Sequence, residues 1–247
     1  MPQIYPITAK ASTMPLALTS AHIAAITNAL SPARLSTYAA PAALVAAPVV
    51  PGATGPSASD RYPLELYRWN SEISGAFLTP LDICSVVLRN AIAEAIEGKY
   101  GARWPWSNGF VRTLPNPSRG YSARQDLLSL QNKFTSTGKI IPELKLVFWS
   151  QMLTARHDQR LWTPLLFQVF PNFPAGPTVA QARNTLYTKM EQLRLFRNRI
   201  AHHEPIFKSP LAQNLTTITE LVAVRCSHTV LWLNDIETVT PLIGRKP

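Results

Sequence analysis

The chain has 247 residues, of which 46% are hydrophobic and only 15% charged, so it can bury a sizeable core and is not a disordered polymer. Its 24 Lys and Arg against 14 Asp and Glu give a formal net charge of +10, which favours nucleic acid or an anionic membrane surface as partner, although a basic protein with no such partner stays open. The two cysteines, Cys84 and Cys226, lie in apolar helical patterns without C-x-x-C spacing, which indicates buried thiols rather than a disulfide framework or a zinc site.

The N-terminal sequence MPQIYPITAK lacks the basic-then-apolar order of a signal peptide. The longest weakly polar run, AAPAALVAAPVVPGA, is interrupted by Pro41, Pro48 and Pro51, so it cannot cross a bilayer as a regular helix. We therefore expect a soluble, cytoplasmic protein without a membrane partner.

The N-terminal region predicts two short helices followed by an irregular stretch. Residues 19–30 form the first helix, and SPARLSTY forms the second, with Ser31 as its N-cap and Pro32 in its first position. Residues 39–60 are rich in Ala, Pro, Gly and Ser without periodicity, which is typical of a surface loop or a mobile insertion.

A helical hairpin is predicted next. Residues 64–77 have apolar side chains at helical spacing. Thr79 and Pro80 then provide an N-cap and first-turn pair for a second helix, which Gly98 is placed to end. These two segments are expected to pack as antiparallel neighbours.

The middle of the chain predicts shorter elements separated by prolines. Residues 101–120 predict a loop anchored by Trp104 and Trp106, and helices follow at 122–134 and 142–153. The stretch LWTPLLFQVFPNFP, before residue 178, indicates one short helix between proline stops.

Two long helices complete the predicted fold. The first begins at Thr178 in a capping box with Gln181 and must end by Pro205. The second begins at Ser209 and Pro210 and continues to about residue 234. No alternating strand pair is evident, so the sequence predicts an all-α helical bundle at 61–247, preceded by short helices and the Pro/Ala/Gly-rich loop at 1–60.

The stretch RLFRNRIAHHEP at residues 194–205 is the candidate functional site. On the helix from residue 178, Leu186, Met190, Leu193 and Ile200 recur on one stripe, and position 197 falls in the same series. Arg197 is therefore expected to interrupt the apolar face, where it must be paired, or face a cleft or a subunit interface. A buried structural ion pair stays open as an alternative.

His202 follows five residues after Arg197, about 140° around an ideal helix and about 7 Å further along it. An arginine and a histidine in a loosening last turn can converge on one phosphate, or can meet across a two-fold interface. Metal binding is the rival use of the His-His-Glu run, but no second cluster with ligand spacing occurs, because His22, His157 and His228 are isolated. No nucleophile-elbow motif supports hydrolysis by Ser or Cys.

Arg197, Asn198 and His202 together resemble the Arg-polar-(x)-His signature of the HEPN superfamily of ribonucleases. The longer string LRLFRNRIAHHEPIF is similar to that of the Abi-like abortive-infection family within this superfamily. SPARLSTY, LELYRWNSEISGAF, VVLRNAIAEAIEGKYGARW and RLWTPLLFQVFP resemble further blocks of that family in the same order, so that the resemblance covers about residues 17–235. The family usually carries an acidic residue where Cys84 and Ser85 stand here.

The resemblance implies a HEPN-type helical bundle that forms a homodimer and cleaves RNA without a metal ion or cofactor. A histidine would take the proton from a ribose 2′-OH or return one to the leaving 5′-oxygen, while Arg197 stabilises the charge on the phosphate. The products would be a 2′,3′-cyclic phosphate and a 5′-OH, and DNA would be inert because it lacks the nucleophile. Such an enzyme would act in phage defence or growth arrest, as a toxin held in check by a protein or RNA antitoxin.

The remaining candidate residues would support this site. Asn198 would orient the phosphate or the histidine. Glu204 would orient a histidine, or its position is explained only by Pro205, which forces it out of the helix. Arg194, Arg199 and His203 would contact the RNA backbone, although each of them is equally well explained as a solvated residue on the helix surface. Arg89 and Asn90 repeat the Arg-Asn pair, which we interpret as a structural contact to the main site. A non-catalytic RNA-binding or assembly module with the same basic cleft, and a metal-dependent hydrolase, stay open as alternatives.

Overall fold

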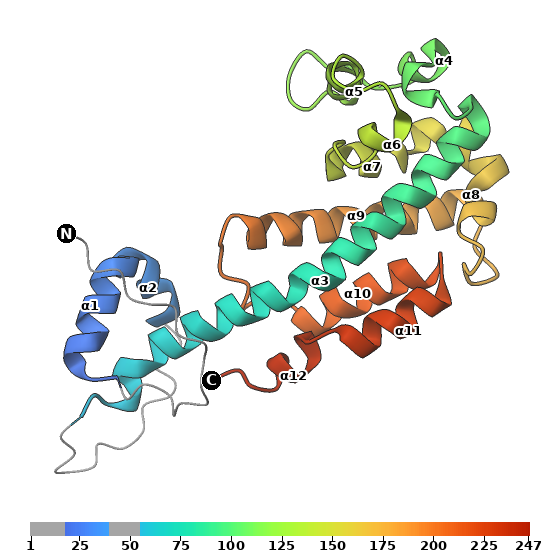
Figure 1. Cartoon of the computed structure of the whole chain (residues 1–247). Coiled ribbons are helices and arrows are strands. Elements are labelled where there is room, and N and C mark those ends of the chain that lie inside the picture. The colour runs from blue at the N-terminus through green and yellow to red at the C-terminus, as the bar shows by residue number, and fades with distance from the viewer. Residues whose placement is uncertain (1–17, 40–54) are drawn as a thin grey trace. The chain divides into compact units, whose positions relative to one another are not determined.

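The computed structural model describes residues 18–39 and 55–247, and every regular element within them is a helix (Figure 1). The prediction of an all-α protein is therefore confirmed. The N-terminal sequence MPQIYPITAK, for which no signal peptide is predicted, lies outside the described residues. Most of the loop predicted at residues 39–60 lies outside them as well. The chain divides into two compact units, one formed by residues 1–71 with 246–247 and the other by residues 72–245.

The N-terminal unit contains α1 (Ser20–Leu30), α2 (Pro32–Ala39) and the beginning of α3. Both predicted short helices are confirmed. Thr19 and His22 close a capping box at the start of α1, and the Ser31 hydroxyl accepts a hydrogen bond from the Arg34 backbone N–H at 3.3 Å. Tyr38 of α2 is buried, and its ring packs edge-on against Tyr67 with the centroids 5.1 Å apart.

Helix α3 (Ala58–Tyr100) corrects the prediction of a hairpin, because it continues without interruption through Thr79 and Pro80. Pro80 cannot donate to the carbonyl of Ala76, which costs a helix about 3 kcal/mol. Buried apolar side chains continue along the helix on both sides of the proline, at Ile73, Phe77, Leu81, Cys84, Leu88 and Ile92. Burial of this continuous stripe outweighs the local cost.

The end of α3 also lies two residues beyond the predicted stop at Gly98. Gly101, with a φ of +82°, donates its backbone N–H to the carbonyl of Glu97 at 2.7 Å. This left-handed position is one that glycine adopts at little cost.

The segment after α3 forms short helices around buried aromatic rings. They are η2 (Trp104–Trp106), α4 (Asn108–Val111), α5 (Ala123–Gln131), α6 (Thr137–Ile140) and α7 (Leu146–Met152). The predicted anchoring role is confirmed for Trp104, which is fully buried and packs edge-on against Phe110 and Trp149. Helix α7 begins four residues later than predicted, so residues 142–145 lie outside it.

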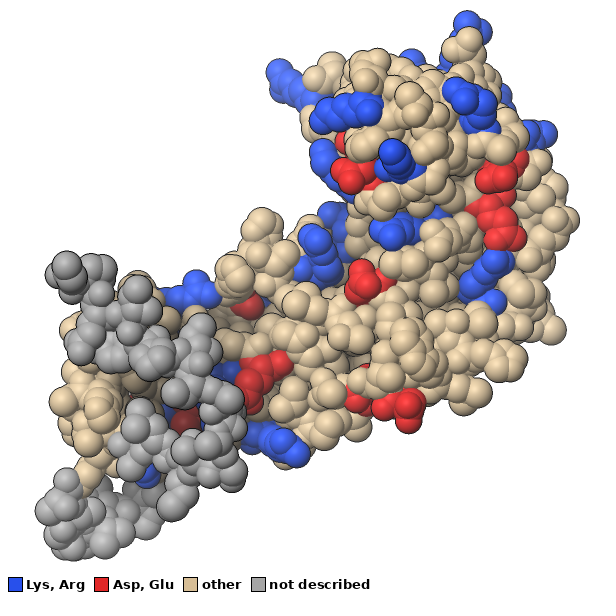
Figure 2. All heavy atoms as spheres, in the orientation of Figure 1, with Lys and Arg blue, Asp and Glu red and all other residues tan. Residues whose placement is uncertain are grey.

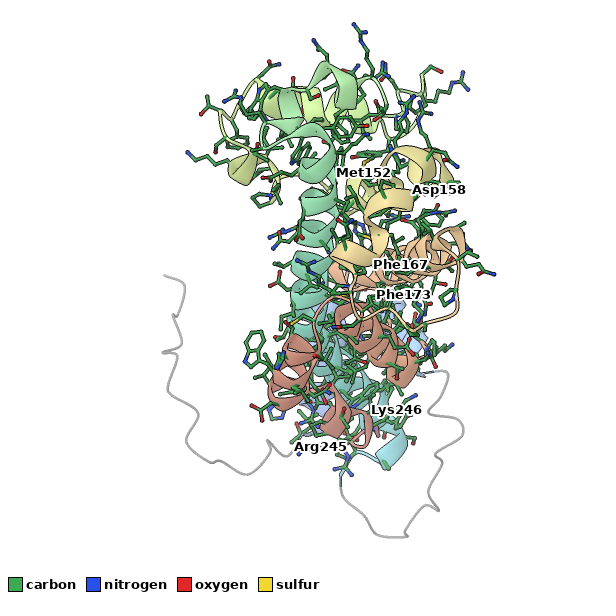
Figure 3. All side chains as sticks on the ribbon, turned by 90° about the vertical axis from the view of Figure 1, so that its right-hand side faces the viewer. Met152, Asp158, Phe167, Phe173, Arg245 and Lys246 are labelled. Carbon is green, nitrogen blue, oxygen red and sulfur yellow. The ribbon has the colours of Figure 1, made fainter. Side chains whose placement is uncertain are left out.

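The connection to the next long helix passes through η3 (Ala155–His157), a π-helical turn η4 (Asp158–Trp162) and α8 (Thr163–Val169). The short helix predicted here is confirmed as α8. Figure 3 shows Phe167 of α8 near Phe173 of the following loop, with ring centroids 6.1 Å apart.

The C-terminal part consists of α9 (Val179–Ala201), α10 (Leu211–Ala223), α11 (Ser227–Ile236) and α12 (Val239–Ile243). The capping box of Thr178 with Gln181 is confirmed. The single helix predicted from Ser209 to residue 234 is wrong, since Val224 to Cys226 separate α10 from α11, and Pro210 rather than Ser209 is the N-cap residue. Cys84 is buried as predicted, whereas Cys226 is only partly buried, and both are free thiols.

Within α3, an 18-residue window reaches a mean hydropathy of 1.4, so this helix is long and apolar enough to cross a membrane by length and composition. The protein buries 44% of that window. Core helices of soluble proteins meet the same criterion, and a single helix of this kind is weak evidence for a membrane span.

Candidate functional site

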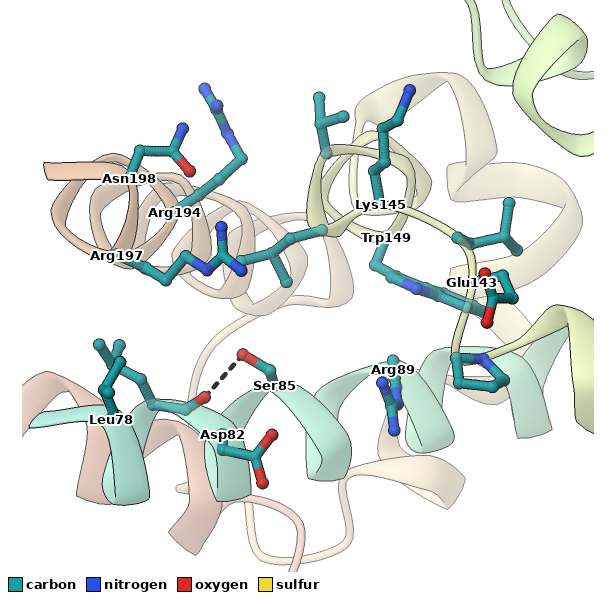
Figure 4. A pocket seen from close by; sticks show the side chains of 15 residues that line it. Leu78, Asp82, Ser85, Arg89, Glu143, Lys145, Trp149, Arg194, Arg197 and Asn198 are labelled. Atoms are coloured by element: carbon teal, nitrogen blue, oxygen red, sulfur yellow. Dashed lines mark hydrogen bonds between the residues drawn. The ribbon is translucent and has the colours of Figure 1, made fainter. Parts of the chain in front are cut away.

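A cavity of about 710 Å³ lies between α3, α9 and the segment that leads into α7 (Figure 4). Its volume is in the range of about 300–1,000 Å³ that is usual for ligand pockets. Among the described residues, its lining contains four basic and two acidic side chains, namely Arg89, Lys145, Arg194 and Arg197 against Asp82 and Glu143. Figure 2 shows the surface around this part of the molecule, with Lys and Arg gathered over the lobe of α4–α7 and the hollow beside it.

Arg197 reaches the cavity from the exposed side of α9, which corrects the prediction that it occupies a core position. Phe196 takes that place instead: it is 5% exposed, and its ring packs edge-on against Phe77 of α3 with centroids 4.9 Å apart. Because a helix turns 100° per residue, Phe196 fills the gap between Leu193 and Ile200 equally well. The guanidinium of Arg197 has no ion pair or hydrogen bond within the described part of the chain, and it lies on the side of α9 that faces α3 (Figure 4).

Asn198 and Arg194 line the same cavity, but Arg194 is already neutralised. Its guanidinium holds Glu191 through two parallel hydrogen bonds of 2.9 Å. Burial alone would raise the pKa of Glu191, but hydrogen bonds from Arg194 and Ser150 outweigh it and leave that pKa below its usual value. Arg194 thus braces the cavity wall, and Arg197 is the basic group of α9 that is available to a ligand.

Helix α9 ends in a Schellman motif at the two histidines. His202 is the C-cap residue, His203 donates its backbone N–H to Ile200 at 3.0 Å, and Glu204 donates to Arg199 at 2.8 Å. His203 occupies the left-handed position with a φ of +56°, where glycine is usual and where other residues lose about 1–2 kcal/mol. The predicted end of this helix before Pro205 is confirmed.

The structure does not bring the histidines into the cavity lining. His202 and His203 are exposed beyond the end of α9, and the lining contains neither. Arg199 points to the following loop, where it donates to the Ser209 hydroxyl at 2.9 Å and to the carbonyl of Pro205. Glu204 lies 3.4 Å from the Arg199 guanidinium, so this pair fastens the loop that carries the histidines.

Helix α3 contributes residues that sequence reasoning assigned only in part. Arg89 lines the cavity, while Asn90 is exposed outside the lining. Asp82 stands one turn before Ser85 and also lines the cavity. Burial raises the pKa of the Cys84 thiol to about 12, so this thiol is not a nucleophile at neutral pH.

Sequence reasoning missed the wall formed by residues 142–149, including Glu143, Lys145 and Trp149. The segment PELK reads as an ordinary polar helix start, and Trp149 reads as a core residue. Only the packing of α7 against α9 brings these side chains opposite α3. No sequence signal marks that packing.

Within residues 18–39 and 55–247, no group of three or more His, Cys, Asp or Glu is arranged to hold a metal ion. Comparison of the chain with known protein families, with curated proteins and with solved structures gives no match. The resemblance to Abi-like proteins therefore rests on the sequence blocks themselves.

Proposed function

We propose that the protein is a metal-independent endoribonuclease of the abortive-infection or toxin type, related to the HEPN superfamily, and that the cavity holds the RNA backbone. One observation carries this proposal: Arg197 and Asn198 of the Arg-Asn-x-x-x-His string line a basic cavity, and the Arg197 guanidinium has no protein partner among the described residues. A guanidinium in this situation is suited to a phosphate, which accepts its hydrogen bonds and balances its charge.

The proposed reaction uses the RNA's own 2′-OH as nucleophile. The 2′-oxygen attacks the adjacent phosphorus, the bond from phosphorus to the 5′-oxygen breaks, and the products are a 2′,3′-cyclic phosphate and a 5′-OH. Arg197 stabilises the charge on the phosphate, while His202 accepts the 2′-OH proton or returns a proton to the leaving oxygen. The backbone N–H of His202 donates to the carbonyl of Asn198 at 2.9 Å, so the histidine stands one helical turn beyond the cavity rim.

The proposal includes a second copy of the chain, an antitoxin and a cytoplasmic location. Large apolar side chains are exposed on α9 and α11, with Leu195 at 56%, Leu231 at 68% and Trp232 at 55%. Side chains of this kind are common in surfaces that a partner covers. A dimer that joins two α9 ends would supply histidines and arginines from both chains to one cleft.

The second candidate function is a non-catalytic RNA-binding or assembly module. This function is favoured by the position of His202 outside the cavity lining, since binding of an RNA backbone needs basic side chains but no histidine. Salt-sensitive RNA binding without turnover would distinguish this module from the enzyme.

The test incubates the purified intact protein with RNA in EDTA, beside Arg197→Ala and His202→Ala. Charge-matched controls are Arg245→Ala and His228→Ala, because both residues are exposed and outside the cavity lining. We expect the Arg197 and His202 variants to lose about 10²-fold or more of the cleavage rate, and the controls to retain it. Equal cleavage by all variants, 5′-phosphate ends, or cleavage of DNA would contradict the mechanism.

A further inference from the structure

The α4–α7 lobe is almost free of acidic side chains. Between residues 98 and 142 the sequence has seven Lys and Arg, and its one acidic residue is Asp126. The carboxylate of Asp126 is already engaged, because it accepts a hydrogen bond from the Tyr121 hydroxyl at 2.7 Å and lies 3.6 Å from the Lys145 ammonium. The positive charge of this part of the chain is therefore not balanced within it.

Most of these basic side chains are exposed and unpaired. Arg124 is the exception, since its guanidinium donates to the carbonyls of Arg112 and Leu114 at 3.0 Å. Five other side chains are exposed and have no ion pair or hydrogen bond within the residues that the structure describes, namely Lys99, Arg112, Arg119, Lys133 and Lys139. Figure 2 shows Lys and Arg gathered over this lobe. Exposed cations without counter-charges attract a polyanion.

Hydrogen bonds between the short helices of the lobe bring part of this charge together. The Thr137 hydroxyl of α6 donates to the carbonyl of Ala102 at 2.6 Å, and a side chain at the end of α5 donates to a carbonyl of η2. Lys139 lies in α6, and Lys133 follows the end of α5 by two residues. Both are thus held near Arg103, the N-cap residue of η2.

Arg103 adds a stacked aromatic ring to this cluster. Its guanidinium lies over the ring of Trp106, 4.7 Å from the centroid, and Arg103 is exposed while Trp106 is partly exposed. A guanidinium held over an indole presents a flat, cationic outer face. The bases of single-stranded nucleic acid stack on aromatic rings and on such guanidinium planes. Basic side chains beside a stacking surface are the combination that binds single strands without sequence preference.

We infer that the α4–α7 lobe is a second RNA-binding surface, which holds single-stranded RNA outside the cavity. The inference rests on the proposed function and assigns its substrate class: an RNA strand that occupies the cavity and the lobe together, rather than a dinucleotide. Lys145 joins the two surfaces, since it lines the cavity and pairs with Asp126 of α5. A strand bound at Arg197 continues past Lys145 onto the lobe.

A single-stranded DNA tests this surface without relying on cleavage, because the lobe contacts phosphates and bases rather than the 2′-OH. The strand has about 20 nucleotides, more than the roughly 4–16 that one such surface spans. Its binding to the intact protein is measured by fluorescence anisotropy as a function of salt. Lys133→Ala/Lys139→Ala should weaken binding about tenfold at about 0.1 M salt and reduce the slope of log affinity against log salt by about 1.4, since each neutralised phosphate of a single strand contributes about 0.7.

Arg61→Ala/Arg245→Ala is the matched control, because it removes the same charge from exposed side chains outside the lobe. It should keep the affinity within about twofold of the original protein. Equal losses in the two double variants would show that net charge alone attracts the strand, and would overturn the inference. Unchanged binding by Lys133→Ala/Lys139→Ala would overturn it as well.

Arg103→Lys tests the stacking surface separately, since lysine retains the charge but lacks the guanidinium plane. It should weaken binding of the DNA strand about fivefold and leave the salt slope unchanged. Polyglutamate of equal total charge, which has no bases to stack, should compete poorly with the DNA. Equal competition by polyglutamate would assign the lobe to an acidic protein instead and contradict RNA binding.

Cleavage measurements separate this inference from the proposed function. Lys133→Ala/Lys139→Ala should raise KM for an RNA of about 20 nucleotides and leave its kcat, and the cleavage of a dinucleotide, unchanged. If the original protein does not cleave RNA, the proposed function fails, while the DNA-binding contrast between the two double variants still decides on the lobe. Normal cleavage without that contrast would reject the lobe alone.

Discussion

The two ends of α9 carry arginines in opposite situations. Near the first end, Arg183 is 7% exposed and holds Asp158 through hydrogen bonds of 2.9 and 3.3 Å. Near the second end, Arg197 is exposed, lines the cavity and has no partner within the described residues. A buried guanidinium must be paired because its desolvation is otherwise uncompensated, whereas an exposed unpaired one in a hollow is available to a ligand. The helix thus has a structural end and a candidate functional end.

The largest expected effect is a loss of stability at the structural end of α9. Arg183→Ala should reduce the free energy of unfolding by about 3–5 kcal/mol, because it leaves the carboxylate of Asp158 partly buried without its partner. Arg197→Ala should change the same quantity by less than about 0.5 kcal/mol. Urea unfolding of both variants checks this contrast, and similar losses for the two would erase the distinction between the ends.

The second expected effect concerns His157, which is buried near the structural end of α9. Its pKa is lowered to about 4, mainly by burial and then by the positive charges of Arg156 and Arg160, whereas the negative charge of Asp158 acts in the opposite direction. In the unfolded chain this histidine binds a proton below about pH 6.5, whereas in the folded protein it binds one only near pH 4. Stability is therefore retained above about pH 6.5 and declines as the pH falls toward 4, by up to about 3 kcal/mol.

His157→Phe should remove this part of the acid sensitivity, because phenylalanine does not titrate. Urea unfolding between pH 4 and pH 7 measures the effect, and His228→Ala, at an exposed position of α11, serves as the control. An acid dependence that stays the same in His157→Phe would show that other groups cause it.

The smallest effect is expected at the functional end, at His203. His203→Ala and His203→Gly both remove the imidazole, but only glycine adopts the left-handed conformation at little cost. The glycine variant should be about 1 kcal/mol more stable than the alanine variant. Thermal unfolding measures the difference.

The same pair of variants also tests whether the imidazole of His203 contributes to RNA binding. Both should then bind RNA equally weakly despite their different stabilities. If only the alanine variant binds RNA poorly, the backbone rather than the imidazole is what matters at this position.

The local signals in the sequence predicted the helices well where those signals were strong. The capping box at Thr178 and the stop before Pro205 placed α9 within a few residues, since both act through the backbone of neighbouring residues. Pro80 misled the prediction, because a continuous buried stripe from Ile73 to Ile92 overrides one proline. The break at Val224 to Cys226 was missed because no proline or glycine marks it.

For the candidate site, the sequence by itself determined which residue types are concentrated at 194–204 and that they lie at the end of a long helix. Only the tertiary structure decided that Phe196 enters the core while Arg197 faces the cavity, that Arg199 and Glu204 fasten the loop, and that residues 142–149 form the opposite wall. The physical reason is that caps and helix ends depend on residues three or four positions apart. A cavity depends on side chains from distant segments, whose orientation is set only when the core packs.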